Sequence, residues 1–383
     1  MEARERYRVA LLDWLACAVG GAQQPAARAA QSAGDGLLES VTWAGCAGHV
    51  LDYDDTYSPG LAHCSAPVAP VALLLAAELG RDIGAVLDAH AAGFELTAAL
   101  SRAGHPALYD RGWHPTAVCG TAGAAVAAAR LMALTPERTD AAIALALLRA
   151  GGLRAAFGSD GKALQVGMAA AAGLHAARIA QAGARVPLAA VSGGPAGYEE
   201  VFGATWPPEA REEAVHQNWI KAYPCCLATH SVIEAALQLR DGRPAPAAAG
   251  ILVHPVARSA AALDDISDGL QAKFSIPYLA AFTLLRGAPR VSDFDRVDDE
   301  ARALAARISV RTDAALAEMQ ARVEVAGRPP AQVESPLGSP GRPMDATRLR
   351  EKLHELAGAR LDGALDDPAA PAAALAQAAG LTS

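Results

Sequence analysis

The chain has 383 residues, more than one compact core of usual size holds, and this length predicts two domains. Hydrophobic residues make up 52% of the chain but aromatic residues only 5%, so the apolar content is mostly Ala and Leu, which favour helices. The net charge of −8, without any run of Lys or Arg, argues against a nucleic-acid-binding protein.

Membrane insertion and secretion are not indicated by the sequence either. No segment reaches the roughly 18 uninterrupted apolar residues of a membrane span, and the charged first residues, 1–6, do not resemble a signal peptide. The six cysteines form no CxxC pair and no zinc spacing, which predicts free thiols in a reducing compartment. We therefore expect a cytoplasmic protein.

Apolar residues recur at helical spacing through most of the first half of the chain. A stretch rich in Gly, Ala and Gln up to about Gly36 interrupts the pattern. The Pro- and Gly-rich stretch 185–209 interrupts it again and is predicted to be a loop at a domain boundary. Helices are predicted over residues 6–19, 67–79, 83–100, 115–133, 136–148 and 167–182.

The pattern then changes to an α+β segment of about 120 residues. Short runs rich in Val and Ile predict strands, and the stretch 319–335 resembles a hairpin with a turn at Gly327. After a Pro- and Gly-rich turn at 339–343 the chain is helical again. Strands are predicted over 251–256, 308–311 and 321–325, and helices between them over 226–239 and 275–285.

The first group of chemically interesting residues is the segment HVLDYDDT, residues 49–56, with His63 shortly after it. Three carboxylates within four residues repel one another, which raises a carboxyl pKa and can create a general acid. A solvated loop with a helix cap explains the same pattern. A metal site built on His49, Asp52 and Asp54 is a third reading, although no known metal spacing matches.

The segment GWHPT places His114 directly before a helix that begins with Pro115. The proline holds His114 in an extended backbone conformation, and the helix N-terminus favours the neutral imidazole, which suits a base. A histidine that only caps or packs is the alternative.

The segment GSDGKALQVG places Lys162 in a Gly- and Ser-rich loop ahead of an alanine-rich helix. Glycines let a ligand approach the backbone, and helix N-termini favour anions. The spacing is not that of a P-loop, and an exposed lysine on a turn is the alternative reading.

The segment KAYPCCLATH joins the helical half to the α+β half, and such linkers often flank a ligand cleft. Lys221 is the better candidate there, as an anion ligand. The pair Cys225 and Cys226 has no partners that would indicate redox or metal chemistry. Tyr278, on an apolar helix, is by itself most readily explained as a core residue.

The order of these segments carries more information than any one of them. The succession HVLDYDDT, GWHPTAVCGTAG, GSDGKALQVGMAAAAG, KAYPCCLATHSVIEAAL and KFSIPYLAAF resembles the MmgE/PrpD family, which includes 2-methylcitrate dehydratase, cis-aconitate decarboxylase and iminodisuccinate epimerase. The late segment SPLGSPGRPM…LREKL looks like a return segment of that family, so the resemblance covers about residues 6–356.

The resemblance implies a mainly α fold. A large all-helical domain would comprise residues 1–215 and 341–383, with a smaller α+β lid domain, 216–340, inserted between its two parts. It also implies a homodimer without metal or organic cofactor, and a small carboxylate as the partner molecule. The implied catalytic residues are Asp52, His63, His114, Lys162, Lys221 and Tyr278, and the implied substrate-binding residues are Lys162, Lys221, Gln165 and Cys226.

Some positions depart from the family pattern. Ala99 stands where many members carry an arginine, Gln165 where the lysine motif often ends in a histidine, and Cys226 where the decarboxylase has a histidine. The region before His49 is also shorter than in most members. These departures argue against cis-aconitate decarboxylase itself and predict a smaller or less highly charged substrate.

The function that we expect is a cofactor-independent, dehydratase-like lyase that removes a proton alpha to a carboxylate of a small di- or tricarboxylate. His114 would be the base, with His63 the next candidate, and the two lysines would stabilise the enediolate. An epimerase or racemase of a dicarboxylate such as iminodisuccinate, using the same intermediate, is the first alternative. A catalytically inactive family member that binds a ligand or serves as a scaffold is the second, and a metal-dependent hydrolase is the remaining rival.

Overall fold

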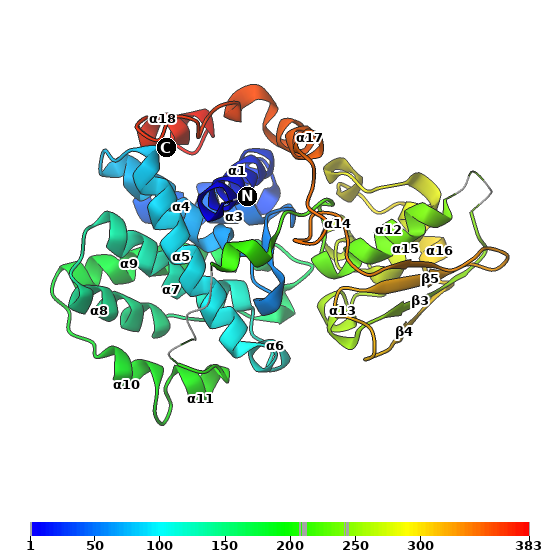
Figure 1. Cartoon of the computed structure of the whole chain (residues 1–383), viewed down its shortest axis with the longest axis horizontal. Helices are drawn as coiled ribbons and strands as arrows, with labels where there is room; N and C mark the ends of the chain where they lie inside the picture. The colour runs from blue at the N-terminus through cyan, green and yellow to red at the C-terminus, as the bar shows by residue number, and fades with distance from the viewer. Residues whose placement is uncertain (1, 207, 209–212, 241, 243–244, 383) are drawn as a thin grey trace.

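The computed structural model describes residues 2–206, 208, 213–240, 242 and 245–382. It shows two lobes side by side, a larger one of helices and a smaller one that contains a four-stranded sheet (Figure 1). The prediction of a mainly helical protein is confirmed. The chain crosses from the first lobe to the second after β2 (Asn218–Trp219) and returns before α17 (Ala346–Ala357).

The larger lobe is built around α7 (Pro115–Leu131), which packs against α5 (Ile83–Gly104), α4 (Ser65–Glu78), α8 (Pro136–Leu147) and α9 (Gly161–Gln181). Small residues allow these helices to approach closely. A Cβ on Gly93 would lie 2.5 Å from the carbonyl oxygen of Gly123, so α5 and α7 touch backbone to backbone there. The alanine-rich composition therefore both favours the helices and permits this packing.

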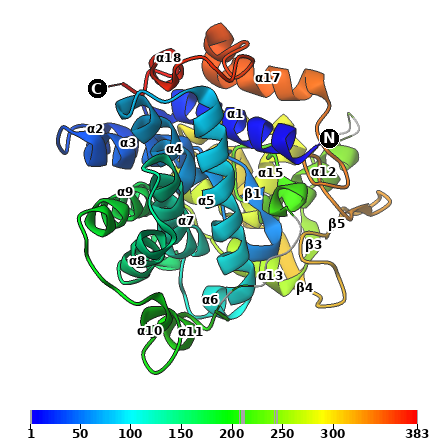
Figure 2. The same ribbon diagram turned by 60° about the vertical axis from the view of Figure 1, so that its left-hand side comes forward.

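The two ends of the chain cover one side of the helical lobe. Helix α17 and α18 (Ala372–Ala378) lie over α1 (Ala3–Gly21) and α4, far from them in sequence (Figure 2). A buried ion pair between Lys352 of α17 and Asp13 of α1, 2.6 Å between Nζ and Oδ1, fastens this contact. The C-terminal segment is therefore part of the helical lobe.

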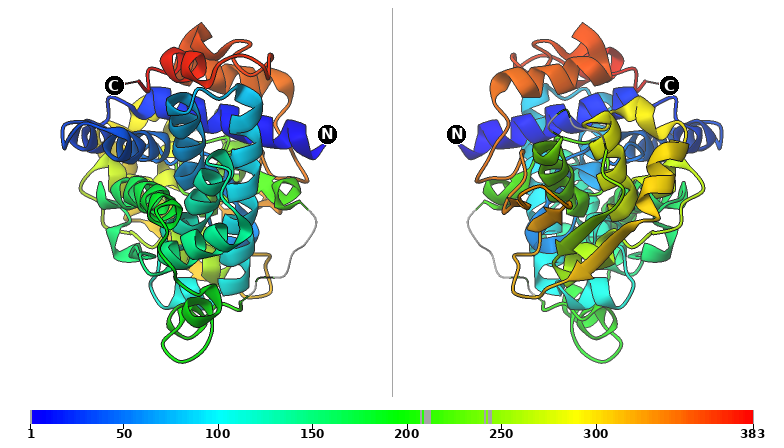
Figure 3. Two further views of the ribbon diagram at one scale, coloured as in Figure 1. Left: turned by 90° about the vertical axis from the view of Figure 1, so that its left-hand side faces the viewer. Right: turned by 90° about the vertical axis from the view of Figure 1, so that its right-hand side faces the viewer.

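The smaller lobe has a sheet in the order β4–β3–β5–β6, in which only the β3–β4 pair is parallel. Its strands are β3 (Ala249–Val253), β4 (Ile308–Thr312), β5 (Ala321–Glu324) and β6 (Ala331–Val333). Helix α12 (His230–Leu239) packs on β5 and β6, and α15 (Ile276–Arg286) packs on β4 (Figure 3, right). The short parallel and antiparallel strands match the predicted α+β segment.

Several elements differ from the sequence-based expectation. The stretch before Gly36 contains α2 (Pro25–Gln31), and α3 (Leu37–His49) was not predicted at all. The predicted loop 185–209 contains α10 (Leu188–Ser192) and α11 (Tyr198–Phe202), and its residues 207 and 209 lie outside the described residues. Because alanine and glycine carry no clear apolar periodicity, these short helices depend on tertiary packing.

Helix α9 begins at Gly161 rather than at the predicted residue 167, so Lys162 lies in its first turn. The predicted strand 251–256 ends at Val253, because His254 caps α13 (Pro255–Ala260) by accepting from the Val256 N–H. The remaining short elements are α6 (Ala107–Asp110), α14 (Gly269–Ala272), α16 (Asp299–Ala305) and the two-residue strand β1 (Thr56–Tyr57), which pairs with β2.

One helix of the described chain, α5, is long and apolar enough to cross a membrane when judged by length and composition alone. It packs against α7 within the helical lobe, and 56% of its most apolar 18-residue window is buried. A core helix meets the same criteria, so this feature does not overturn the expectation drawn from the sequence.

Candidate active site between the lobes

A pocket lies where the two lobes meet and encloses about 480 Å³, part of it at the open mouth. The helical lobe supplies its imidazole groups, Asp52 and Lys162, and the second lobe supplies Lys221 and mostly apolar walls. This volume suits a small organic molecule. The lining residues are Asp52, Thr56, Leu61, His63, Tyr109, His114, Phe157, Lys162, Lys221, Cys226, Leu227, Ala228, Ala260, Phe274 and Met319.

The backbone that carries Asp52 is held by buried lysines. Residues 50–53 follow α3, and the carbonyl oxygen of each accepts a hydrogen bond from an ammonium group at 2.8–3.2 Å. Lys273 binds the first two carbonyls, Lys221 the third and Lys352 the fourth. These contacts come from three distant segments and hold Asp52 at a φ of 53°, a left-handed conformation that is costly for a residue with a Cβ.

Two of the predicted cations meet on Asp52. Its Oδ1 accepts from Lys162 Nζ at 2.7 Å and from Lys221 Nζ at 2.9 Å, and all three residues are buried. Burial alone would raise the pKa of Asp52, but the two lysines outweigh it and hold that pKa well below the ordinary value. Two ammonium groups against one carboxylate leave one formal positive charge on this wall of the pocket.

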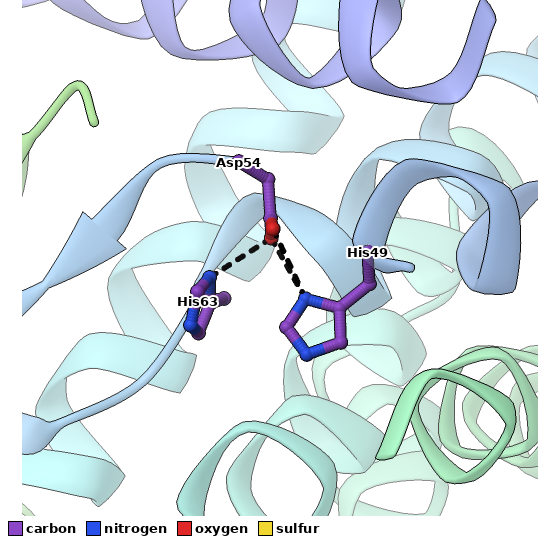
Figure 4. A group of neighbouring side chains, drawn as sticks. All are labelled: His49, Asp54 and His63. Atoms are coloured by element: carbon purple, nitrogen blue, oxygen red, sulfur yellow. Dashed lines mark hydrogen bonds and ion pairs between the residues drawn. The ribbon is translucent and has the colours of Figure 1, made fainter. Parts of the chain in front are cut away.

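Asp54 lies behind the pocket, between two histidines (Figure 4). Its carboxylate is 2.9 Å from His49 Nδ1 and 3.0 Å from His63 Nδ1. Burial lowers the pKa of His63 to about 3 although Asp54 opposes the shift, so the ring is neutral. The two ring N–H groups in turn keep the pKa of Asp54 well below its ordinary value despite burial.

These pKa directions distinguish the three acids of the cluster. The sequence allowed a carboxyl of raised pKa that could act as a general acid, but cations and N–H donors hold the pKa values of Asp52 and Asp54 well below the ordinary value. The pKa of Asp55 is raised, by burial and by neighbouring carboxylates. Asp55 accepts from the side chain of Asn218 and does not line the pocket.

His114 also lines the pocket and precedes α7 directly, at the helix N-terminus that the sequence predicted. Burial first and Lys162 second lower its pKa well below the ordinary value, so this imidazole is also neutral. Its Nδ1 lies 2.7 Å from Gln165 Nε2, and its ring packs edge-on against Phe157 with centroids 4.9 Å apart. Gln165 therefore touches His114 and is not itself among the residues that line the pocket.

The structure brings together Asp52, His63, His114, Lys162, Lys221 and Cys226, which all line the pocket. It does not bring Tyr278 there. The Tyr278 hydroxyl accepts from the Asp298 N–H at 3.0 Å, and its ring belongs to the core of the second lobe. The sequence already indicated that Tyr278, which lies on an apolar helix, could be a core residue.

Sequence reasoning missed the apolar walls and the supporting charges. Phe157 and Phe274 flank Lys162, whose Nζ lies 5.5 Å and 5.3 Å from their ring centroids. Lys273 is the first residue of the segment KFSIPY, which contributes to the family resemblance, but the sequence did not predict it as a site residue. Tyr109 lines the pocket from α6, a helix of four residues that leaves no periodic signal.

The structure groups the candidate metal ligands differently from the sequence-based hypothesis. His49, Asp54 and His63 offer ligand atoms within 4.8 Å of one another, the group of this kind found in the described part of the chain. Asp52, which the sequence-based alternative included, instead binds two lysines, whose charges repel a cation. In the remaining three, the distances of 2.9–3.1 Å match N–H···O hydrogen bonds to Asp54.

Fold and pocket together define a helical two-lobed protein with two buried lysines and two histidines in the pocket between its lobes. Residues 38–210 match the MmgE/PrpD N-terminal domain, and residues 223–369 match the MmgE/PrpD C-terminal domain. The chain therefore belongs to the MmgE/PrpD family, and the resemblance seen in its sequence is confirmed.

Curated relatives share the family at low identity. The cis-aconitate decarboxylase of Mus musculus is 28% identical over 274 residues, which are 65% of this chain and 55% of that protein. The enzyme of the same name from Homo sapiens is 30% identical over 212 residues, 51% of this chain and 43% of that protein. The Aspergillus terreus enzyme gives 30% over 212 residues, 50% of this chain and 43% of that protein. The chain thus spans about half the length of the curated relatives it matches.

Proposed function

We propose that the protein is a cofactor-independent, dehydratase-like lyase that removes a proton alpha to a carboxylate of a small di- or tricarboxylate. The observation that carries the proposal is the pairing, in one pocket, of two buried ammonium groups with two neutral imidazoles. The relatives named cis-aconitate decarboxylase support a polycarboxylate substrate.

The chemistry follows from these charges. A proton alpha to a carboxylate is weakly acidic, because its removal adds a second negative charge that is shared by the alpha carbon and the carboxylate oxygens. Lys162 and Lys221 would bind the carboxylate and stabilise this enediolate in a site where water is scarce and charges interact strongly. Since both lysines are held on Asp52 Oδ1, a substrate carboxylate competes with Asp52 for them.

A neutral imidazole is the group that would accept the proton. The carboxylate of Asp52 is a weak base because its pKa is held well below the ordinary value. The low imidazole pKa keeps His63 and His114 unprotonated at neutral pH, and the developing enediolate raises the proton affinity of a base beside it. We therefore place Asp52 in the binding of the lysines and a histidine in the proton transfer.

We also propose that residues 216–340 act as a lid over the pocket and that the active form is a homodimer with no metal or organic cofactor. Lys221, Cys226 and Phe274 come to the pocket from this part of the chain, which supports a role in covering the substrate. Light scattering of the eluted protein tests the dimer, and a monomer with full activity would reject it.

Proton NMR in D2O with chelator-treated protein tests the reaction. The panel is malate, citrate, 2-methylcitrate, cis-aconitate and iminodisuccinate. Deuterium at an alpha carbon with loss of water supports the lyase, and exchange with inversion supports an epimerase. Activity lost on chelation and restored by a metal ion would instead favour the metal-dependent hydrolase.

The His175→Gln variant is the matched control, because His175 is an exposed histidine on α9 outside the pocket. It should exchange like the wild type, and His63→Gln should not. No exchange with any compound, together with no change in melting temperature on their addition, would reject the proposal in favour of an inactive family member.

A further inference from the structure

The orientation of the Gln165 side chain is settled by the backbone beside it. Its Oε1 accepts from the Leu153 N–H at 2.9 Å, and its Nε2 lies 3.3 Å from the Leu153 carbonyl oxygen. A backbone N–H can only donate and a carbonyl oxygen can only accept, so the amide oxygen and nitrogen cannot be exchanged. The same Nε2 is 2.7 Å from His114 Nδ1.

The backbone of Leu153 is itself fixed relative to His114. Trp113 and Leu153 form an antiparallel bridge, and the His114 N–H donates to the Gly152 carbonyl at 2.9 Å. The ring of His114 is also confined by Phe157, which packs edge-on against it. The amide of Gln165 therefore meets the Nδ1 edge of a ring that has little freedom to turn.

The proton position on His114 follows from this arrangement. An amide NH₂ group only donates, so His114 Nδ1 must accept, and in a neutral imidazole the proton is then on Nε2. The Nε2 atom is buried and has no hydrogen-bond partner among the residues that the structure describes, although His114 lines the pocket. It is thus an N–H donor without a partner in the described part of the chain, on a residue that lines the pocket, and an oxygen of a bound substrate would supply the missing acceptor.

His63 has the opposite polarity. Asp54 is ionised and accepts from His63 Nδ1 at 3.0 Å, so the lone pair of His63 is on Nε2. That atom lies 3.7 Å from Oδ1 of Asp52, beyond hydrogen-bond distance, and both residues line the pocket. One pocket imidazole therefore accepts a proton and the other donates a hydrogen bond.

We propose that Gln165 is a positioning residue that fixes the Nε2–H tautomer of His114, so that His114 serves as a hydrogen-bond donor to a substrate oxygen and His63 is the base. This inference rests on the proposed function for its catalytic part. It moves the base from His114, the first candidate from the sequence, to His63.

The proposed step is balanced without any further reactant. His63 Nε2 forms a bond to the alpha proton, the C–H bond breaks, and its electron pair enters the enediolate. The enediolate pair then forms the double bond between the alpha and beta carbons, the C–O bond to the beta hydroxyl breaks with its electron pair on oxygen, and the proton on His63 passes to that oxygen to give water. His114 keeps its proton throughout, because a neutral imidazole that lost it would become an unstable imidazolate; it only stabilises charge on oxygen.

The test combines a tautomer measurement with kinetics. In ¹⁵N-histidine-labelled protein, long-range ¹H–¹⁵N correlation distinguishes the protonated from the unprotonated ring nitrogen, and His114→Gln identifies the His114 signals among the 10 histidines. In the wild type we expect the proton on His114 Nε2. In Gln165→Glu a carboxylate replaces the amide, so the proton should move to Nδ1, and kcat should fall by about 10²-fold with KM little changed.

Gln165→Met is the matched variant, because it keeps the size of the side chain but offers no hydrogen bond. It should give a mixture of both tautomers and a kcat between those of the wild type and Gln165→Glu. A wild-type proton on Nδ1, or a reversed tautomer in Gln165→Glu with unchanged kcat, would overturn the inference. If the wild type turned over no carboxylate, the proposed function would fail, whereas the tautomer would still be read from the spectrum alone.

Discussion

Replacing Lys162 by Met separates a catalytic lysine from a structural one. The change removes one of the two ammonium groups on Asp52 Oδ1, but Lys221 remains 2.9 Å from the same oxygen, so the buried carboxylate keeps a cation. We therefore expect a loss of stability of about 1–3 kcal/mol, the cost of weakening a buried charged group, rather than unfolding. That loss corresponds to a fall in melting temperature of roughly 1–4 °C for a chain of this length.

The effect of the same change on catalysis should be larger. Lys162 would stabilise charge that develops only in the transition state, and loss of one such donor costs about 10²–10³ in kcat. The assay is deuterium exchange at the alpha carbon of the best substrate, with the melting temperature measured in parallel. Arg178→Met is the control, because Arg178 is on the same helix, half-exposed and paired with Glu78 2.9 Å away, outside the pocket. A variant that exchanges at the wild-type rate, or one that does not fold, would refute the role assigned to Lys162.

Four further predictions test three other groups. Asp54→Asn should lower kcat by about 10³-fold with KM little changed, because the carboxylate that orients His63 is lost; steady-state kinetics measures this, and an unchanged kcat would contradict it. Tyr278→Phe should keep activity within about threefold and cost about 1 kcal/mol, since the hydroxyl binds only the Asp298 N–H; a large loss of kcat at unchanged melting temperature would restore Tyr278 to the site. The pKa of His63 is lowered to about 3, so between about pH 3 and 6.5 the unfolded chain binds more protons than the folded chain. The free energy of unfolding should therefore decline as the pH falls through this range, and His63 should not affect it at higher pH. The kcat/KM of the folded protein should stay constant from about pH 7.5 to 5.5, and an acid limb with a midpoint near 6.5 would show that His63 titrates normally.

The helices that the sequence predicted best are those with an apolar face, such as 83–100 and 136–148, which the structure shows as α5 and α8. Helix α3 was not predicted, although its last residue, His49, was named from the sequence as a candidate metal ligand. Its residues include Gly45 and Gly48, which sequence reasoning takes as weak helix breakers. In the structure a Cβ on Gly45 would lie 2.9 Å from the Cα of Gly167, so Gly45 lets α3 approach α9, and Gly48 makes room for the Trp14 ring of α1.

The residue types and the order of their segments along the chain predicted part of the chemistry of the site. The sequence determined that Asp52, His63, His114, Lys162 and Lys221 belong together, because their segments follow one another as in the family. It could not determine their charge states. Adjacent acids are expected to raise one another's pKa, and only the fold shows that lysines from distant segments reverse this for Asp52.

Local periodicity and the order of residues along the chain were enough to predict a mainly helical protein, an α+β segment and a set of candidate site residues. The tertiary structure alone decided which groups face the pocket, which way Gln165 is turned and which ring nitrogen of each histidine is free. Those properties depend on contacts between residues up to 299 positions apart, as between Lys352 and the Tyr53 carbonyl, and such distances leave no local pattern in a sequence.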